Sequence, residues 1–127
     1  TGVQTCALPI LKYPWGEYFP PKKEDGNYAI LANGKNDPEG VGVDGIKGTA
    51  LVGSVKANAL GFNDFGGTVA EWMLDGYNVD DPKASRVHRG AFWKQDANGC
   101  ATGNRGSLLP THNRPFTGFR IASGSTR

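Results

Sequence analysis

Short stretches of alternating apolar and polar residues lie between longer polar segments, and they predict β-strands joined by ordered loops. Four stretches have this pattern, and they cover residues 49–55, 68–74, 86–93 and 117–122. In the first, the alternation places Leu51 or Val52 inward. The 19 glycines favour a loop-rich α+β fold over a helical bundle, because they are about twice the usual share.

The stretch at 68–74 gives the sharpest prediction. Val69 and Glu71 fall on one of its faces, while Ala70, Trp72 and Leu74 fall on the other. The pattern predicts that the tryptophan anchors the core, because a buried indole supplies a large apolar area. The glutamate is then expected to point back toward the preceding loop.

That preceding loop, residues 59–67, contains the residue types of a calcium site. Its glycines allow backbone conformations that are closed to other residues, so the chain can fold its carbonyls inward. Side-chain oxygens of Asn63, Asp64 and Glu71 can then converge with them on a common point. Hard oxygen ligands in this arrangement are typical of Ca2+ sites, so we expect a structural calcium ion.

Charge and hydropathy exclude several functional classes. The chain has 14 basic and 12 acidic residues, a net charge of +2, and no basic run, which argues against binding to nucleic acid or to a membrane surface. No apolar run approaches the ~18 residues that a membrane span needs.

Residues 1–10, TGVQTCALPI, resemble a widely used sequencing adapter translated in frame, so we interpret them as an assembly scar. Cys6 would then be absent from the natural protein, which leaves Cys100 as the cysteine of this region. The true N-terminus and any sorting signal would also be missing. Localisation therefore stays open.

Four separated motifs carry a family resemblance. They are YPWG at 13–16, the glycine-rich run at 48–72, RGAFW at 89–93 and GFR at 118–120. In this order they resemble the formylglycine-generating enzyme family, also called the sulfatase-modifying factor domain. The resemblance implies a C-type-lectin-like α+β fold. Because YPWG lies mid-domain in that family, residues 11–127 would be the C-terminal half of a domain with about 100 or more further residues upstream.

The resemblance also implies metal ligands. The family's second calcium site maps onto Asp64, Gly67, Val69 and Glu71, with the glycine and valine contributing carbonyls. Its first calcium site maps onto residues on either side of a somewhat longer loop, and these residues are Asn27, Tyr28, Asp44 and Ile46.

Enzymes of the family oxidise a substrate cysteine to formylglycine with copper held by two cysteines five positions apart. Counting from the flanking motifs places that pair at Ala97 and Thr102, or at Cys100 and Arg105, so the sequence offers one thiol where Cu(I) needs two. We therefore expect no copper-dependent oxidase activity, and predict a module that binds a protein or peptide. An active oxidase that borrows a thiol from the missing half stays open as an alternative, with Cys100 as its catalytic residue.

The long aperiodic segment at 94–117 is the expected binding surface, because long loops in small domains tend to be functional. The candidate ligand-binding residues in and beside it are His88, Phe92, Asn98, Asn104, Arg105, His112, Asn113, Arg114 and Phe116. A nucleophilic pair of Cys100 with His112 is compatible with the spacing, although a single cysteine among glycines is more often structural.

A second interpretation comes from bacterial proteins of the same fold that are diversified by retroelements. Their variable positions lie between the RG and GFR motifs, where template adenines are mutated. Lys94 and Gln95 cannot arise that way from Asn codons, whereas six other residues can, and these are His88, Phe92, Leu108, Leu109, His112 and Phe116. A place at the bacterial cell surface or in the periplasm would suit such a binding protein.

Overall fold

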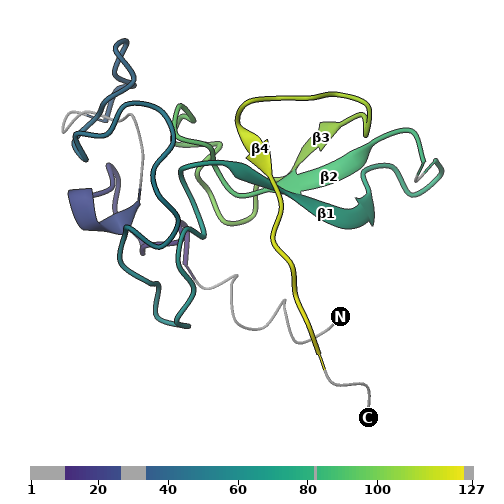
Figure 1. Cartoon of the computed structure of the whole chain (residues 1–127), viewed down its shortest axis with the longest axis horizontal. Coiled ribbons are helices and arrows are strands. Elements are labelled where there is room, and N and C mark those ends of the chain that lie inside the picture. The colour runs from purple at the N-terminus through teal and green to yellow at the C-terminus, as the bar shows by residue number, and fades with distance from the viewer. Residues whose placement is uncertain (1–10, 27–33, 82, 125–127) are drawn as a thin grey trace.

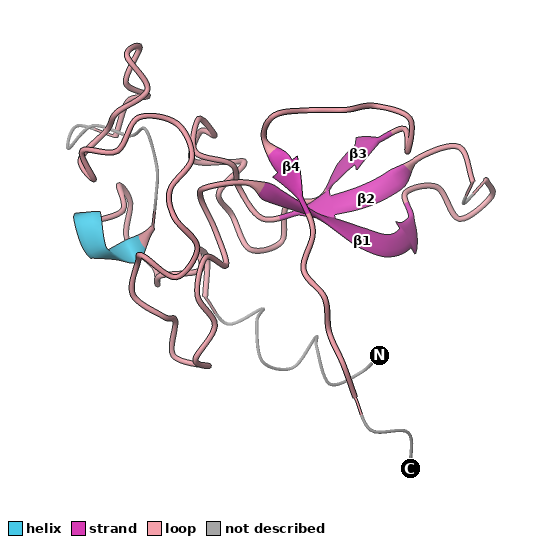
Figure 2. Ribbon diagram, viewed as in Figure 1, coloured by secondary structure: helices cyan, strands magenta, loops and turns pink. Residues whose placement is uncertain are grey.

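The computed structural model describes residues 11–26, 34–81 and 83–124, and most of them are loops (Figures 1 and 2). One turn of 3-10 helix, η1 (Lys23–Asp25), precedes four strands. The strands are β1 (Ala70–Gly76), β2 (Arg86–Arg89), β3 (Gly106–Leu108) and β4 (Thr117–Gly118). They form one sheet in the order β3-β2-β1-β4. No helix in the described ranges has the length and apolarity that a membrane span requires.

The sheet is mixed. The β2 strand pairs antiparallel with β1 on one side and with β3 on the other, while β4 runs parallel to β1. Trp72 pairs with His88, and Glu71 lies between Arg89 on β2 and Gly118 on β4. Glu71 is therefore in the centre of the sheet, beside the motif that ends the chain's last strand.

The core lies beside the sheet, where the aromatic N-terminal segment packs on the loop after β2. Tyr13 is stacked on Trp15 with ring centroids 5.0 Å apart, and it closes a tight turn through two hydrogen bonds with Gly16. Tyr13, Ala91 and Cys100 are buried together. The YPWG motif is thus an aromatic clamp that joins distant parts of the chain.

The strands differ from the sequence prediction in extent. The stretch at 49–55 forms no strand, and Leu51 and Val52 are 83% and 92% exposed. The stretch at 86–93 ends its ladder at Arg89, because Gly90 turns the backbone with a φ of +79°. The stretch at 117–122 pairs only over its first two residues.

Two further expectations were wrong. Leu74 shares the face of the buried Ala70 but is 95% exposed, because no described segment packs over the end of β1. The strand β3 lies within the segment that had been predicted as aperiodic loop. The helical part of the expected α+β class is not found in the described residues, whose only helix is η1.

Candidate functional site

The glycine-rich loop before β1 is held by its own polar side chains. Asn58 Oδ1 accepts hydrogen bonds from the backbone amides of Leu60 and Phe62, each at 3.0 Å. Asp64 has a φ of +54°, a conformation that aspartate tolerates better than most residues, and its Oδ2 accepts a hydrogen bond from the Gly53 amide at 2.6 Å. These contacts aim the carbonyls of residues 63 and 64 toward the sheet.

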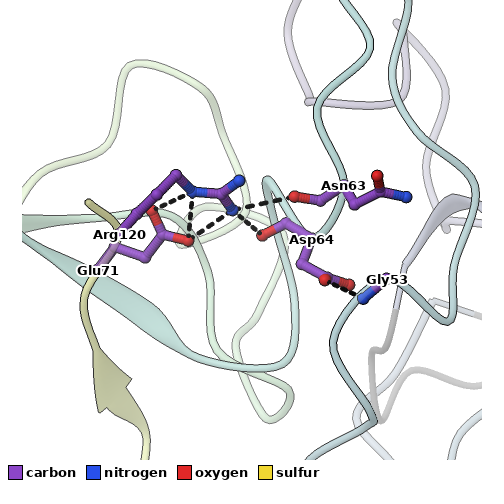
Figure 3. A network of polar contacts seen from close by, with 5 residues as sticks. All are labelled: Gly53, Asn63, Asp64, Glu71 and Arg120. Atoms are coloured by element: carbon purple, nitrogen blue, oxygen red, sulfur yellow. Dashed lines mark hydrogen bonds and ion pairs between the residues drawn. The ribbon is translucent and has the colours of Figure 1, made fainter. Parts of the chain in front are cut away.

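In the structure, the backbone carbonyls of Asn63 and Asp64 and the carboxylate of Glu71 meet at the guanidinium of Arg120 (Figure 3), whereas the side chain of Asn63 donates to the Val55 carbonyl at 3.0 Å. Arg120 Nη2 donates to the carbonyl of Asn63 at 2.9 Å, to the carbonyl of Asp64 at 3.2 Å and to Glu71 Oε1 at 2.7 Å. Its Nε donates to both carboxylate oxygens of Glu71, at 3.1 and 3.0 Å. The hydrogen bonds to the glutamate raise the pKa of Arg120.

This arginine was not among the predicted site residues, although it is the last residue of the GFR motif. The guanidinium also lies 5.7 Å from the centre of the Phe65 ring. Through its contacts with a carboxylate, two carbonyls and an aromatic face, Arg120 joins the segment after β4 to the loop before β1. The pairing of a GFR arginine with a glutamate on a central strand could be found only once the two segments were known to be neighbours.

Cys100 is buried at 2% exposure, and its thiol points toward the carbonyl of Gln95 at 3.8 Å. Burial, together with the charge of Asp96, raises the pKa of Cys100 to about 12. The thiol is therefore protonated at neutral pH, whereas metal binding and nucleophilic attack both require the thiolate.

The segment after Cys100 divides into an anchored part and an exposed part. In the anchored part, Arg105 lies over the ring of Tyr77 at 4.7 Å and donates from Nη2 to the Tyr77 carbonyl at 3.0 Å. Asn104 donates from its side chain to the carbonyl of Gly99 at 3.2 Å. Arg105 therefore holds the segment against the β1–β2 connection, and Asn104 holds it to the turn before Cys100.

The exposed part connects β3 to β4. Phe92 and Phe116 stack there with ring centroids 4.4 Å apart, and both are half-buried. The side chains of His112, Asn113 and Arg114 beside the stack are exposed. This combination of an aromatic platform and free polar groups is a surface that a ligand can reach.

The two remaining predicted ligand-binding residues lie apart from that stack in the chain. Asn98 is exposed in the turn before Cys100. His88 lies on β2, where its ring covers Gly106 so closely that a β-carbon on the glycine would lie 2.2 Å from it. Burial lowers the pKa of His88, and its Nδ1 is buried with no hydrogen-bond partner in the described residues.

Comparison with known proteins identifies the family. The sequence model described as the sulfatase-modifying factor enzyme 1-like domain matches residues 9–124. The chain belongs to this family. A search of curated proteins finds no match.

Solved structures have the same fold. The chain is similar to Treponema denticola variable protein 1, with 28% sequence identity over 78% of this chain and 40% of that one, and a TM-score of 0.54. It is also similar to PvdO from Pseudomonas aeruginosa, with 23% identity, 85% and 42% coverage and a TM-score of 0.62. The chain thus spans less than half the length of these two relatives.

Within the sulfatase-modifying factor fold, the predicted second calcium site has one strong candidate ligand atom. Asp64 Oδ1 is buried and has no hydrogen-bond partner in the described part of the chain, so a cation there would satisfy it. Glu71 is shared with Arg120, yet a carboxylate accepts about four contacts and retains capacity for a metal. The residue types therefore suit calcium, while the cation that Glu71 contacts in this structure is Arg120.

The structure describes only some of the other predicted calcium ligands. Asn27 and Tyr28 lie outside the described residues. Asp44 is buried, and its Oδ1 accepts a hydrogen bond from the backbone amide of Ile46 at 2.9 Å. Gly67 has a φ of +78°, which turns the chain between Asp64 and β1.

Proposed function

We propose that this domain binds a protein or peptide ligand through the exposed part of the β3–β4 connection, without oxidising it. We call this surface the 109–116 surface, and it includes the Phe92–Phe116 stack. The observation that carries the proposal is that the chain between β2 and β4 has a buried part around Cys100 and an exposed part at 109–115. The Cys100 thiol is buried, and burial raises the pKa of that thiol, whereas the aromatic stack is half-buried and the polar side chains at 112–114 are exposed.

The chemistry of the stack suits recognition of a peptide. Two rings in contact offer a rigid apolar surface that loses little side-chain entropy on binding. His112, Asn113 and Arg114 beside it supply donors and an acceptor in exposed positions. An anchor of this kind surrounded by polar groups is the usual arrangement of an interface centre and its rim.

A binding experiment tests this proposal directly. Peptides selected from a random displayed library on the full-length protein would be measured by fluorescence anisotropy. We expect Phe116→Ala to weaken the selected peptides by about 30-fold, as at an interface hot spot, and Arg114→Ala to weaken acidic ones. The control is Lys83→Ala, which removes an exposed charge from the β1–β2 connection and should leave affinity unchanged.

An oxidase assay supplies the opposing outcome. The full-length protein would be incubated with Cu(I), oxygen and a cysteine peptide of the sulfatase type, and the peptide weighed by mass spectrometry. We expect the peptide mass to stay unchanged. Conversion of the cysteine to the aldehyde by the wild type, with loss of conversion in Cys100→Ser, would overturn the proposal and establish the oxidase.

A second candidate function is that of a binder diversified by a retroelement. It is favoured by the similarity to a protein whose name describes it as variable. The codon pattern at His88, Phe92, His112 and Phe116 agrees with it, while Lys94 and Gln95 do not. Long-read sequencing of the locus decides the matter, because this function requires a reverse transcriptase and a template repeat nearby.

Calcium is proposed as a structural ligand of the same domain, held by Asp64 and Glu71 with the carbonyls of Gly67 and Val69. When bound, the ion would neutralise the carboxylates and fix the loop before β1. At 100 times its dissociation constant it would stabilise the fold by about 2.7 kcal/mol. Thermal melting should therefore shift downward with a chelator in the wild type and stay unchanged in Asp64→Asn. No shift in the wild type would leave Arg120 as the sole cation of the loop.

A further inference from the structure

A cavity of about 350 Å³ lies where β1 ends and β2 begins, and we call it the β1–β2 cavity. Its volume is near the lower limit for pockets that hold small molecules, which is about 300 Å³. None of the residues that form the aromatic stack or the predicted calcium sites lines it. The lining residues are Trp72, Met73, Leu74, Arg86 and Pro110.

Irregular pairing of β1 with β2 shapes this cavity. Between Trp72 and Gly76, four residue steps along β1 lie opposite two along β2. Extra residues of this kind bend a strand and interrupt the alternation of its side chains. Met73 and Leu74 would point to opposite sides of a regular strand, yet both line the cavity.

Apolar groups supply four of the five lining side chains. Trp72 is half-buried, whereas Leu74 is 95% exposed. Pro110, from the β3–β4 connection, adds a rigid ring. A concave surface of this kind gains free energy when an apolar ligand removes it from water.

Arg86 is the charged residue of the lining. It is half-buried, and its Nη1 donates to the carbonyl of Leu74, which fixes the guanidinium at the cavity. In the described part of the chain it forms no ion pair and no other hydrogen bond, so most of its five donors are available. A guanidinium with free donors beside apolar groups suits a carboxylate, which it can bind through two parallel hydrogen bonds.

We propose that the β1–β2 cavity binds a small monocarboxylate with an apolar body. Arg86 holds the carboxylate, and the apolar body packs on Trp72 and Leu74. The unpaired positive charge argues for an anion, and the small volume argues for a small molecule over a segment of another protein. This site goes beyond the peptide binding proposed above, with which it shares only Pro110 among its lining residues.

Met73 provides a direct measurement of binding. It is the single methionine of the sequence, so a 13C label on its methyl group gives an NMR signal from the cavity. The protein would be titrated with octanoate and 3-phenylpropionate, and with the uncharged amide of each. We expect saturable shifts, with at least one carboxylate binding at least about tenfold more tightly than its amide. Equal affinities of both carboxylates and their amides, or no saturable shift with either carboxylate, would overturn the proposal.

Substitutions test the role of the guanidinium. Arg86→Gln should abolish the preference for carboxylate over amide, and the amide affinity shows whether the cavity itself survives. The matched control is Arg89→Gln, because Arg89 is exposed, lies on the same strand and points to the other face of the sheet. Leu74→Glu is a second variant at an exposed position, and its carboxylate should compete for Arg86. Unchanged carboxylate preference in the Arg86 and Leu74 variants would contradict the assignment.

A peptide terminus is the other source of the same chemistry. A peptide that ends in leucine would be titrated with a free and with an amidated C-terminus. We expect the free peptide to bind no more tightly than the better of the two small carboxylates; binding more than about tenfold tighter, lost on amidation, would make a peptide terminus the ligand and refute the small-molecule assignment. Phe116→Ala should leave carboxylate binding unchanged, so the two proposed sites can fail separately.

Discussion

The pairing of Glu71 with Arg120 makes a quantitative prediction about stability. A double-mutant cycle would use Glu71→Gln, Arg120→Gln and the double variant. The single arginine substitution should cost more than the single glutamate substitution, because Arg120 also donates to the carbonyls of Asn63 and Asp64. Those two carbonyls lose their donor only in the arginine variants.

The magnitude follows from geometry and exposure. Three hydrogen bonds of 2.7 to 3.1 Å join the two side chains, which are 21% and 36% exposed for the glutamate and the arginine. Exposed ion pairs contribute about 0.2–1 kcal/mol, and breaking a fully buried pair costs about 3–5 kcal/mol. Because the arginine is more than a third exposed, solvent screening keeps the expected coupling near the lower range, at about 1 kcal/mol. That corresponds to a shift of about 3–5 °C in melting temperature.

Urea unfolding at low and at high salt measures the coupling. The coupling energy should be smaller at high salt, because both side chains are partly exposed and dissolved ions screen their charges. A parallel cycle of Glu71→Gln with Lys83→Gln serves as control, because no contact joins that pair and the two effects should add. A coupling below about 0.3 kcal/mol, within the usual additivity error, would refute the assignment of Arg120 as the cation that closes the loop.

Three further predictions concern the core and the sheet. Iodoacetamide should alkylate Cys100 at least about 100-fold more slowly in the native protein than in urea, because the thiol is buried and its pKa is raised to about 12; equal rates would show that the thiol is accessible. Gly40→Ala should destabilise by at least about 1–2 kcal/mol in thermal melts, because Gly40 has a φ of +75° and a β-carbon there would lie 2.8 Å from the Trp93 ring. Burial lowers the pKa of His88, so the folded protein resists protonation that the unfolded chain accepts near pH 6.5. Below that pH the unfolded chain binds a proton that the folded protein does not, so the free energy of unfolding falls as the pH decreases toward the lower pKa of folded His88. The variant His88→Gln should therefore flatten the acid side of the pH–stability curve. An unchanged curve would contradict this prediction.

Much of what the sequence predicted concerns single segments. The alternation at 68–74 predicted a strand, and β1 forms at 70–76 with Ala70 buried, because alternation is a local property of the chain. Trp72, the expected core anchor, is only half-buried.

The glycine-rich loop was expected to bring the side-chain oxygens of Asn63, Asp64 and Glu71 to a calcium ion, which stays a prediction. In the structure the carbonyls of residues 63 and 64 and the Glu71 carboxylate meet at Arg120, while the Asn63 side chain donates to the Val55 carbonyl. The four motifs predicted the family, which the comparison confirms.

The sequence did not reveal which groups meet across the chain. Arg120 is 49 residues from Glu71, and no local pattern connects them. The sequence pattern placed Leu51 and Leu74 on inward faces, yet both side chains are exposed. Whether one face of a segment is buried depends on what packs against it as well as on its own residues. Cys100 likewise became a protonated core residue only through its burial with Tyr13 and Ala91. Local pattern therefore predicted the strands near 68–74 and 86–93, but neither β3 nor the lack of a strand at 49–55. The tertiary structure determined the cation and the buried thiol, because these depend on neighbours that are distant in sequence.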